Sequence, residues 1–242
     1  LLRQELRETS VYNAIIEAVA LGNNTLALIH SKTQIEKTKI SVYLKNLMEI
    51  GIIEREFSVL STVKERAGSG RGLYQLTDAY FRFWYAFLYG SHSELEAGDV
   101  AGVWQHLIVP QLHEFVSRTY EKICMEYLRA CNQAGTLPFH FIKIGRWWEK
   151  VTHIADGKRR TVSEEIDIVA ADRAEQNFLL AECKFRRAPA DLDVLRQLQD
   201  KFPQKKYHGN YHYMIFSFYG FTERLRDAAA QENVRLVSGE EI

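Results

Sequence analysis

The first third of the chain has short helical patterns followed by strand-like alternation. Apolar residues at helical spacing predict three helices, which run over Val11–Leu21, about Thr25–Ser31 and roughly Lys37–Met48. Alternation typical of a strand follows over Ile52–Val59, and a loop rich in Gly, Ser and Arg leads to a second strand at Leu73–Leu76. Three helices followed by a hairpin are typical of a winged helix-turn-helix, which we expect over residues 1–78.

The third predicted helix carries the residues expected to contact DNA. Basic and hydroxyl side chains on its exposed side suit phosphates and base edges, and Arg71 lies at the predicted tip of the wing. The candidates on the helix are Lys37, Lys39, Ser41 and Lys45. Acidic residues at both ends of this helix dilute its basic face, and winged helices also act as packing or protein-contact modules. DNA binding and protein contact both stay open for this module.

The middle of the chain is interpreted as structural. Asp78–Tyr89 is unusually aromatic, but its spacing is helical and it contains only one Arg, which favours a buried connecting helix over a base-stacking surface. A long helical pattern follows from about Val100 to Ala130. We therefore expect a helical linker over residues 79–110 and a further domain over residues 111–242.

The last half of the chain alternates between strand and helix patterns. Strand-like alternation predicts five strands, at Phe139–Ile144, Glu164–Ala170, Phe178–Phe185, Tyr211–Phe218 and Val234–Val237. Helical patterns fill two of the connections, at Asp191–Lys201 and Thr222–Gln231. This order predicts an α/β domain, in a chain that is α+β overall.

Charged residues interrupt two of the most apolar predicted strands. Side chains alternate along a strand, so Glu165 and Asp167 are expected on one face. Ile166 and Ile168 are expected on the opposite face. In the following strand Glu182 shares a face with Lys184. Charges in central strands are costly unless they are paired or bound to metal, which is the physical reason to predict a site here.

These residues suit metal-dependent hydrolysis of a phosphodiester. The hard carboxylate oxygens of Asp167 and Glu182 are expected to hold Mg²⁺ (or Mn²⁺), which keeps waters and takes a substrate phosphate as a further ligand. Glu121 supplies a third carboxylate from the preceding helix, and Glu165 is a further acidic candidate. Lys184 is expected to position the attacking water or to neutralise the phosphate.

The same residues resemble a known nuclease pattern. Asp167, followed by Glu182-Cys183-Lys184 on the next strand, resembles the PD-(D/E)XK motif. Glu121 matches the acidic residue often supplied by the first core helix of that fold. The resemblance implies a restriction-endonuclease-like α/β domain with a central mixed sheet and a deoxyribonuclease activity. Ile166 stands where the motif has Pro, which leaves the Asp in place.

The order of motifs resembles a longer architecture. Tyr74–Asp78, Phe81–Trp84 and Ile144–Trp148, followed by the nuclease-type residues, resemble the C-terminal region of archaeal-type P-loop ATPases over nearly the whole chain. The resemblance implies that the chain is the C-terminal part of an ATPase-associated protein, with a P-loop ATPase domain or subunit as partner. The sequence has no Walker A motif, so we expect this chain alone not to use ATP.

Bulk composition changes this picture little. The chain has 242 residues, of which 46% are hydrophobic and 26% charged, as is ordinary for a folded protein. The number of Lys and Arg residues equals the number of Asp and Glu residues, so nucleic-acid binding must come from local clusters of charge. Beside the site, we expect Arg146, Trp147 and Arg186 to contact DNA. No membrane segment or targeting peptide is visible, so we expect a soluble, cytoplasmic protein.

Two functions follow from the sequence. The first is a magnesium-dependent endonuclease with a winged-helix DNA anchor, favoured by the presence of Asp167, Glu182 and Lys184 together. The second is a non-catalytic module that binds DNA or a partner protein and regulates an ATPase, favoured by the neutral overall charge and by the missing ATPase. The sequence decides neither the DNA structure recognised nor the oligomeric state.

Overall fold

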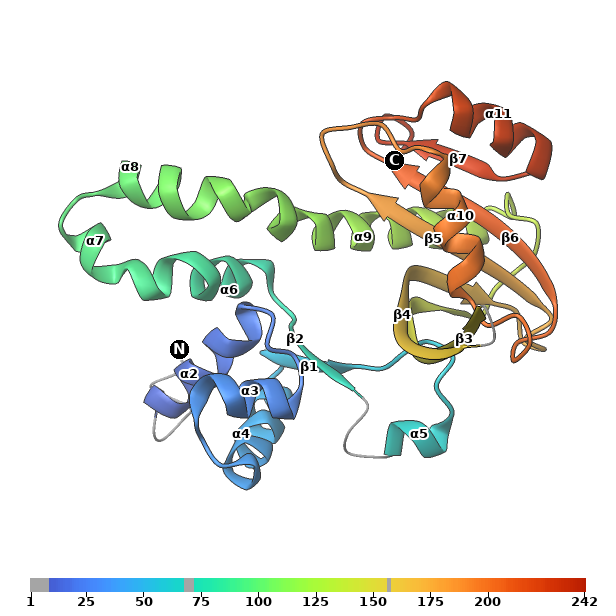
Figure 1. Cartoon of the computed structure of the whole chain (residues 1–242). Coiled ribbons are helices and arrows are strands. Elements are labelled where there is room, and N and C mark those ends of the chain that lie inside the picture. Colours follow the sequence, from blue (N-terminus) through green and yellow to red (C-terminus); the bar gives the residue numbers. More distant parts are fainter. Residues whose placement is uncertain (1–8, 68–71, 156–157) are drawn as a thin grey trace. The chain divides into compact units, whose positions relative to one another are not determined.

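The chain forms two compact units in the computed structural model, which describes residues 9–67, 72–155 and 158–242 (Figure 1). The first unit comprises residues 1–57 and 61–110, and the second comprises residues 58–60 and 111–242. The expected division into three domains is finer than this one and stays a prediction. Within the described ranges, no helix is long and apolar enough to cross a membrane.

Three helices and a two-stranded antiparallel sheet form the core of the first unit. These elements are α2 (Thr9–Ala20), α3 (Leu26–Thr33), α4 (Lys37–Glu49), β1 (Ile53–Glu56) and β2 (Leu73–Leu76), with α5 (Val63–Ala67) in the connection between the strands. Ile15, Ile40 and Leu44 are fully buried in their common core. The three predicted helices and the second strand are confirmed. The prediction lacks α5, because a helix of five residues is too short to have a clear period.

The rest of the first unit consists of consecutive helical segments. They are α6 (Ala79–Phe83), η1 (Trp84–Leu88), η2 (Tyr89–Ser91), α7 (His92–Glu96), α8 (Val100–Gly102) and η3 (Val103–Ile108), followed by α9 (Val109–Gln133), which continues into the second unit. The aromatic stretch is helical as predicted, but it is buried only in part. Tyr85 and Phe87 lie in the interior, whereas Tyr80 is 66% exposed.

A five-stranded mixed sheet forms the centre of the second unit. Its order is β3-β4-β5-β6-β7, made of β3 (Lys143–Ala155), β4 (Lys158–Ala171), β5 (Asn177–Lys184), β6 (Asn210–Ser217) and β7 (Arg235–Ser238). β3, β4 and β5 pair antiparallel, whereas β5, β6 and β7 pair parallel. The parallel connections pass through α10 (Leu192–Lys201) and α11 (Glu223–Glu232). The predicted mixed sheet is confirmed.

Helices cover both faces of this sheet (Figure 1). On one face Cys124 of α9 packs in a cluster with Ile168. On the other face Leu198 of α10 packs in a cluster with Leu180, and Leu225 of α11 lies in an adjoining cluster. Burial on both faces explains why β5 reads as a nearly continuous apolar run. A charged side chain in β5 therefore needs an oppositely charged partner to offset the cost of its burial.

The first strand of the sheet differs from the prediction. The expected strand over Phe139–Ile144 is wrong except at its end, because β3 begins at Lys143 and runs to Ala155. β4 likewise begins earlier than predicted, at Lys158. The outer arms of this hairpin are rich in Lys, Arg and Glu and lack alternating apolar residues. Their pairing with each other, rather than burial, defines them as strands.

Candidate functional site

An extra residue in β4 sets the position of Asp167. The pairing of β3 with β4 passes from Gly145↔Val169 to Trp147↔Ile166, so two β4 residues, Asp167 and Ile168, oppose Arg146 alone. This β-bulge interrupts the alternation of side chains. The prediction that Ile166 and Ile168 share a face is therefore wrong. Ile166 packs with Trp147, while Ile168 packs in the cluster on the α9 side.

The Asp167 carboxylate takes part in joining β4 to β5. Backbone pairing of these strands ends at Ile168↔Ala181. Next to this pair, the Cys183 N–H donates to Asp167 Oδ2 at 2.8 Å. A buried backbone N–H needs an acceptor, and the Asp167 side chain provides one for Cys183 beyond the last backbone pair of β4 and β5. Asp167 is thus held at the end of the β4–β5 ladder.

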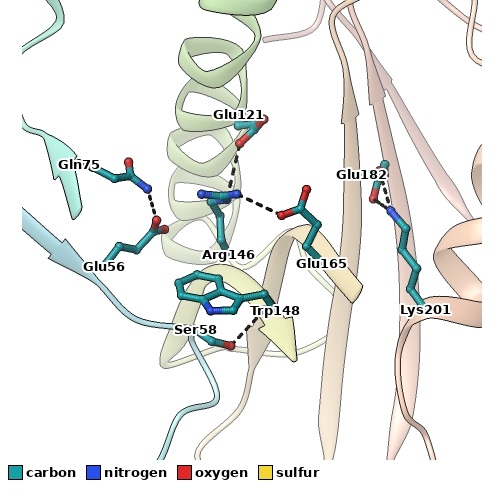
Figure 2. Close-up of polar contacts among 9 residues, drawn as sticks. All are labelled: Glu56, Ser58, Gln75, Glu121, Arg146, Trp148, Glu165, Glu182 and Lys201. Atoms are coloured by element: carbon teal, nitrogen blue, oxygen red, sulfur yellow. Dashed lines mark hydrogen bonds and ion pairs between the residues drawn. The ribbon is translucent and has the colours of Figure 1, made fainter. Parts of the chain in front are cut away.

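Glu182 lies in the interior between two lysines. The residue is 6% exposed, and Lys184 Nζ donates to its Oε1 at 2.8 Å. Lys201, the last residue of α10, places its Nζ 3.1 Å from Oε1 and 3.3 Å from Oε2 (Figure 2). A buried carboxylate requires compensating charge, and these two ammonium groups provide it.

Arg146 connects the helix layer to the sheet. Figure 2 shows its guanidinium between Glu121 of α9 and Glu165 of β4. The ion-pair distances are 3.9 Å to Glu121 and 3.4 Å to Glu165. The backbone of Arg146 is also fixed, because its carbonyl accepts the Val59 N–H at 2.9 Å. Arg146, predicted to bind DNA, thus pairs with two of the acidic candidates.

Burial and neighbouring charges shift the pKa values of Asp167, Glu121 and Lys184. Burial, followed by the charges of Glu182 and Glu121, raises the pKa of Asp167 to about 7. Burial also raises the pKa of Glu121, against the opposing charge of Arg146. Burial acts to lower the pKa of Lys184, but the charge and hydrogen bond of Glu182 outweigh it, so that this pKa is raised. A strongly raised carboxylate pKa beside other charged groups is typical of functional sites.

The structure brings together four of the five catalytic candidates. Asp167, Glu182 and Glu121 act on one another electrostatically, and Lys184 bonds to Glu182. Glu165 stays at the edge, with a side chain that is 66% exposed and paired with Arg146. The prediction that Glu165 lies beside the other carboxylates assumes regular alternation along the strand. The bulge interrupts this alternation close to Glu165.

The donor set suits a hard cation, although the side chains pair with one another. All three acidic candidates offer carboxylate oxygens, the ligands that Mg²⁺ prefers, and Mg²⁺ needs only one or two of them because it keeps waters. Within the described residues, no group of three or more His, Cys, Asp or Glu side chains is arranged to hold a metal ion. Lysines contact both carboxylate oxygens of Glu182.

The predicted DNA-contact residues have different environments. Lys37, Lys39, Ser41 and Lys45 are exposed on α4, and Arg186 is exposed just beyond β5. Arg71 lies outside the described residues. Trp147 is 1% exposed and packs against Phe202, so its predicted contact with DNA is wrong. The bulge assigns Trp147 to the α10 side of the sheet, where its large apolar ring fills the core.

Lys201 is the residue of this site that the sequence prediction leaves out. It belongs to a basic stretch that also includes Lys205 and Lys206, which fits phosphate contacts and a solvated surface equally well. Lys201 nevertheless reaches Glu182, because α10 packs across β5 through Leu198 and Phe202. Helical spacing offers a signal, since Lys201 follows buried Leu198 by three residues and so lies near the buried face of the helix.

The chain matches a family model and a longer relative. Residues 84–197 match the family DUF234, described as "Archaea bacterial proteins of unknown function". Over 86% of its length, the chain is 29% identical to an uncharacterized protein of Methanocaldococcus jannaschii. It spans only 43% of the length of that relative.

Two solved structures are similar to part of the chain. A repair endonuclease from Pyrococcus abyssi is 16% identical, with a TM-score of 0.26, over 39% of this chain and 38% of the endonuclease. The protein EndoMS in complex with double-stranded DNA is also 16% identical, with a TM-score of 0.25, over 39% of this chain and 36% of EndoMS. TM-scores this low do not say what the present chain does.

The raised pKa of Asp167 predicts a stability that depends on pH. The ordinary value is 3.8, so between about pH 4 and 7 the folded chain keeps a proton that the unfolded chain releases. The free energy of unfolding therefore falls as the pH rises through this window, by at most about 4 kcal/mol at about 1.4 kcal/mol per pKa unit. Asp167→Asn keeps an acceptor for the Cys183 N–H and carries no charge. We expect this substitution to raise the Tm at pH 8 more than at pH 4.5.

Thermal unfolding in EDTA, followed by circular dichroism across this pH range, measures the effect. Asp193→Asn, an exposed change on α10, serves as the control. A Tm difference for Asp167→Asn that stays constant with pH would show that Asp167 titrates normally.

Proposed function

We propose that the second unit is a metal-dependent phosphodiesterase that cleaves DNA, a nuclease of the PD-(D/E)XK type. One observation carries the proposal. Glu182, 6% exposed, is held by Lys184 and Lys201 next to Asp167, whose pKa is raised to about 7. Burying this many charges costs stability, and a structural role does not require them. A chemical role in charge stabilisation explains their presence.

Carboxylates of the site would hold the metal. Asp167 and Glu182, assisted by Glu121, offer the hard oxygen donors that suit Mg²⁺ or Mn²⁺. When bound, the metal lowers the pKa of a coordinated water and stabilises negative charge on the phosphate. Lys184 and Lys201 would balance the negative charge of Glu182 within this donor set.

The chain's own side chains would orient and neutralise the phosphate. Lys184 keeps a raised pKa and stays protonated at neutral pH, so it offers a fixed positive charge at the strand end. Arg146 holds Glu121 toward the sheet through their ion pair. Asp167 is fixed by the Cys183 N–H, so its free carboxylate oxygen keeps a defined direction.

The first unit would anchor the nucleic acid. Its three helices and hairpin support a winged helix-turn-helix, in which α4 would present Lys37, Lys39, Ser41 and Lys45 to DNA. Exposed Arg186 would contact phosphates beside the site. The chain spans less than half of its M. jannaschii relative. Association with a P-loop ATPase domain or subunit belongs to this proposal.

A non-catalytic binding module is the second candidate. Glu182 already has two ammonium partners, and Arg146 contacts both Glu121 and Glu165. A site whose charges are internally satisfied is stable without metal or substrate. Such a unit would bind DNA or a partner protein without hydrolysing it.

Cleavage of DNA separates the two candidates. Plasmid, linear, branched and single-stranded DNA are incubated with the chain and Mg²⁺ or Mn²⁺, and products are resolved on gels. We expect metal-dependent cleavage that falls about 100-fold or more in Asp167→Asn, Glu182→Gln and Lys184→Ala, because each removes a charge that stabilises the transition state. Asp193→Asn should cleave like wild type. Salt-sensitive binding without cleavage by any form would favour the binding module.

Lys201 should affect cleavage through Glu182. Lys201→Met removes the ammonium that contacts both oxygens of Glu182, so we expect cleavage to fall about tenfold and the metal concentration for half-maximal rate to change. Lys201→Arg keeps the charge and should recover most of the rate. Lys205→Met, an exposed neighbour, is the matched control. Equal rates and metal dependence for wild type and Lys201→Met would exclude a role for Lys201.

A further inference from the structure

Aromatic side chains gather at the carboxyl ends of β5 and β6. Phe185 follows the last residue of β5, and Phe218 and Tyr219 follow the last residue of β6. The ring centroids of Phe185 and Phe218 are 5.1 Å apart, those of Phe218 and Tyr219 5.2 Å, and those of Phe185 and Tyr219 6.5 Å. These three residues form one cluster, named here the aromatic platform.

The platform is supported from α9 and open to solvent. Tyr120 of α9 packs against Phe185 at 5.5 Å and against Phe218 at 6.0 Å, and His113 lies 4.9 Å from Phe185. Phe218 and Tyr219 are nonetheless 47% and 45% exposed. A contiguous group of half-exposed rings that pack against a helix on one side is typical of a binding surface rather than of a core.

The platform adjoins the candidate site at two points. Phe185 directly follows Lys184, and the Phe218 N–H donates to the Lys184 carbonyl at 3.1 Å. Tyr120, which supports the platform, directly precedes Glu121 on α9. β5 and β6 run parallel, and ligands of such sheets bind at the carboxyl ends of the strands.

The surrounding charge favours nucleic acid as the occupant. Arg186 and Arg187 continue from the platform and are both exposed. Lys184 carries a positive charge just before it. Exposed rings beside cations match a strand in which phosphates alternate with bases, because each base has a π-face and each phosphate is an anion. A paired base keeps its faces inside the duplex stack, so only an unpaired base can lie on the rings.

We propose that the aromatic platform stacks an unpaired nucleobase of the strand whose phosphate lies at Lys184. The substrate class is therefore nucleic acid with an unpaired base beside the scissile phosphate, as in flaps, branches and single-strand junctions. This inference rests on the proposed function for the position of the strand. Tyr219 is the more informative of the two exposed rings, since Phe218 also packs closely against Gly239.

Binding without cleavage tests this inference. Asp167→Asn protein in EDTA is titrated into two fluorescent oligonucleotides, a fully paired duplex and the same duplex with a single-stranded flap. A 2-aminopurine at the first flap position reports stacking through quenching of its fluorescence. We expect the flap to bind about tenfold more tightly than the duplex and its 2-aminopurine to be quenched.

Substitutions at Tyr219 give the decisive comparison. Tyr219→Leu keeps an apolar side chain but removes the ring, so the preference for the flap and the quenching should both be lost. Tyr219→Trp keeps an aromatic face and should preserve both. Tyr80→Leu, which removes an exposed aromatic ring on α6, is the matched control and should leave both unchanged.

The outcomes separate this inference from the proposed function. Equal affinity for flap and duplex, no binding of either, or equal weakening of both by Tyr219→Leu would each overturn the platform as a base-stacking surface. If wild-type protein nevertheless cleaves DNA with metal, the nuclease proposal stands alone. Flap preference lost in Tyr219→Leu, without cleavage by wild-type protein, would retain the platform and contradict the nuclease.

Discussion

The burial of Glu182 is the constraint that organises the second unit. The residue is 6% exposed in a strand covered on both faces, so water stabilises its charge little. Lys184 compensates it from the same strand and Lys201 from the end of α10. The packing of α10 on the sheet is therefore part of the site. Removing either lysine leaves a buried charge with incomplete compensation, which is costlier than losing an exposed ion pair.

The bulge in β4 adds a second carboxylate to this environment. Asp167 lies at the bulge, where β4 has one extra residue. Its Oδ2 accepts a hydrogen bond from the Cys183 N–H, beyond the end of the β4–β5 backbone pairing. Its pKa is raised to about 7 by burial and by Glu182 and Glu121. An arrangement that holds carboxylates together against their repulsion lowers stability. Proteins keep such arrangements at sites where activity needs them.

Local patterns in the sequence predict much of the fold. β2 matches its predicted bounds, Leu73–Leu76, and α4 matches within a residue, because short apolar periods determine these elements directly. The apolar runs around Asp167 and Glu182 likewise point to the site, because charges in central strands need a partner or a metal. The winged-helix interpretation, the binding of DNA and the metal stay predictions.

The features that the sequence does not reveal depend on long-range contacts. The charged arms of β3 and β4 are strands because they pair with each other, and no apolar pattern marks them. The bulge moves Trp147 into the core and leaves Glu165 at the edge with Arg146, which regular alternation cannot predict. Lys201 reaches Glu182 only because α10 crosses β5, a contact between residues 19 apart in sequence.

Direct measurement of metal binding is the sharpest test of the central claim, that these carboxylates form a metal-dependent hydrolytic site. Mn²⁺ is titrated into the whole chain with a phosphorothioate oligonucleotide, and free Mn²⁺ is followed by electron paramagnetic resonance. We expect saturable binding to wild type and to Asp193→Asn, and its loss in Asp167→Asn and Glu182→Gln. Absence of saturable binding to wild type, or equal binding by all four proteins, would contradict it.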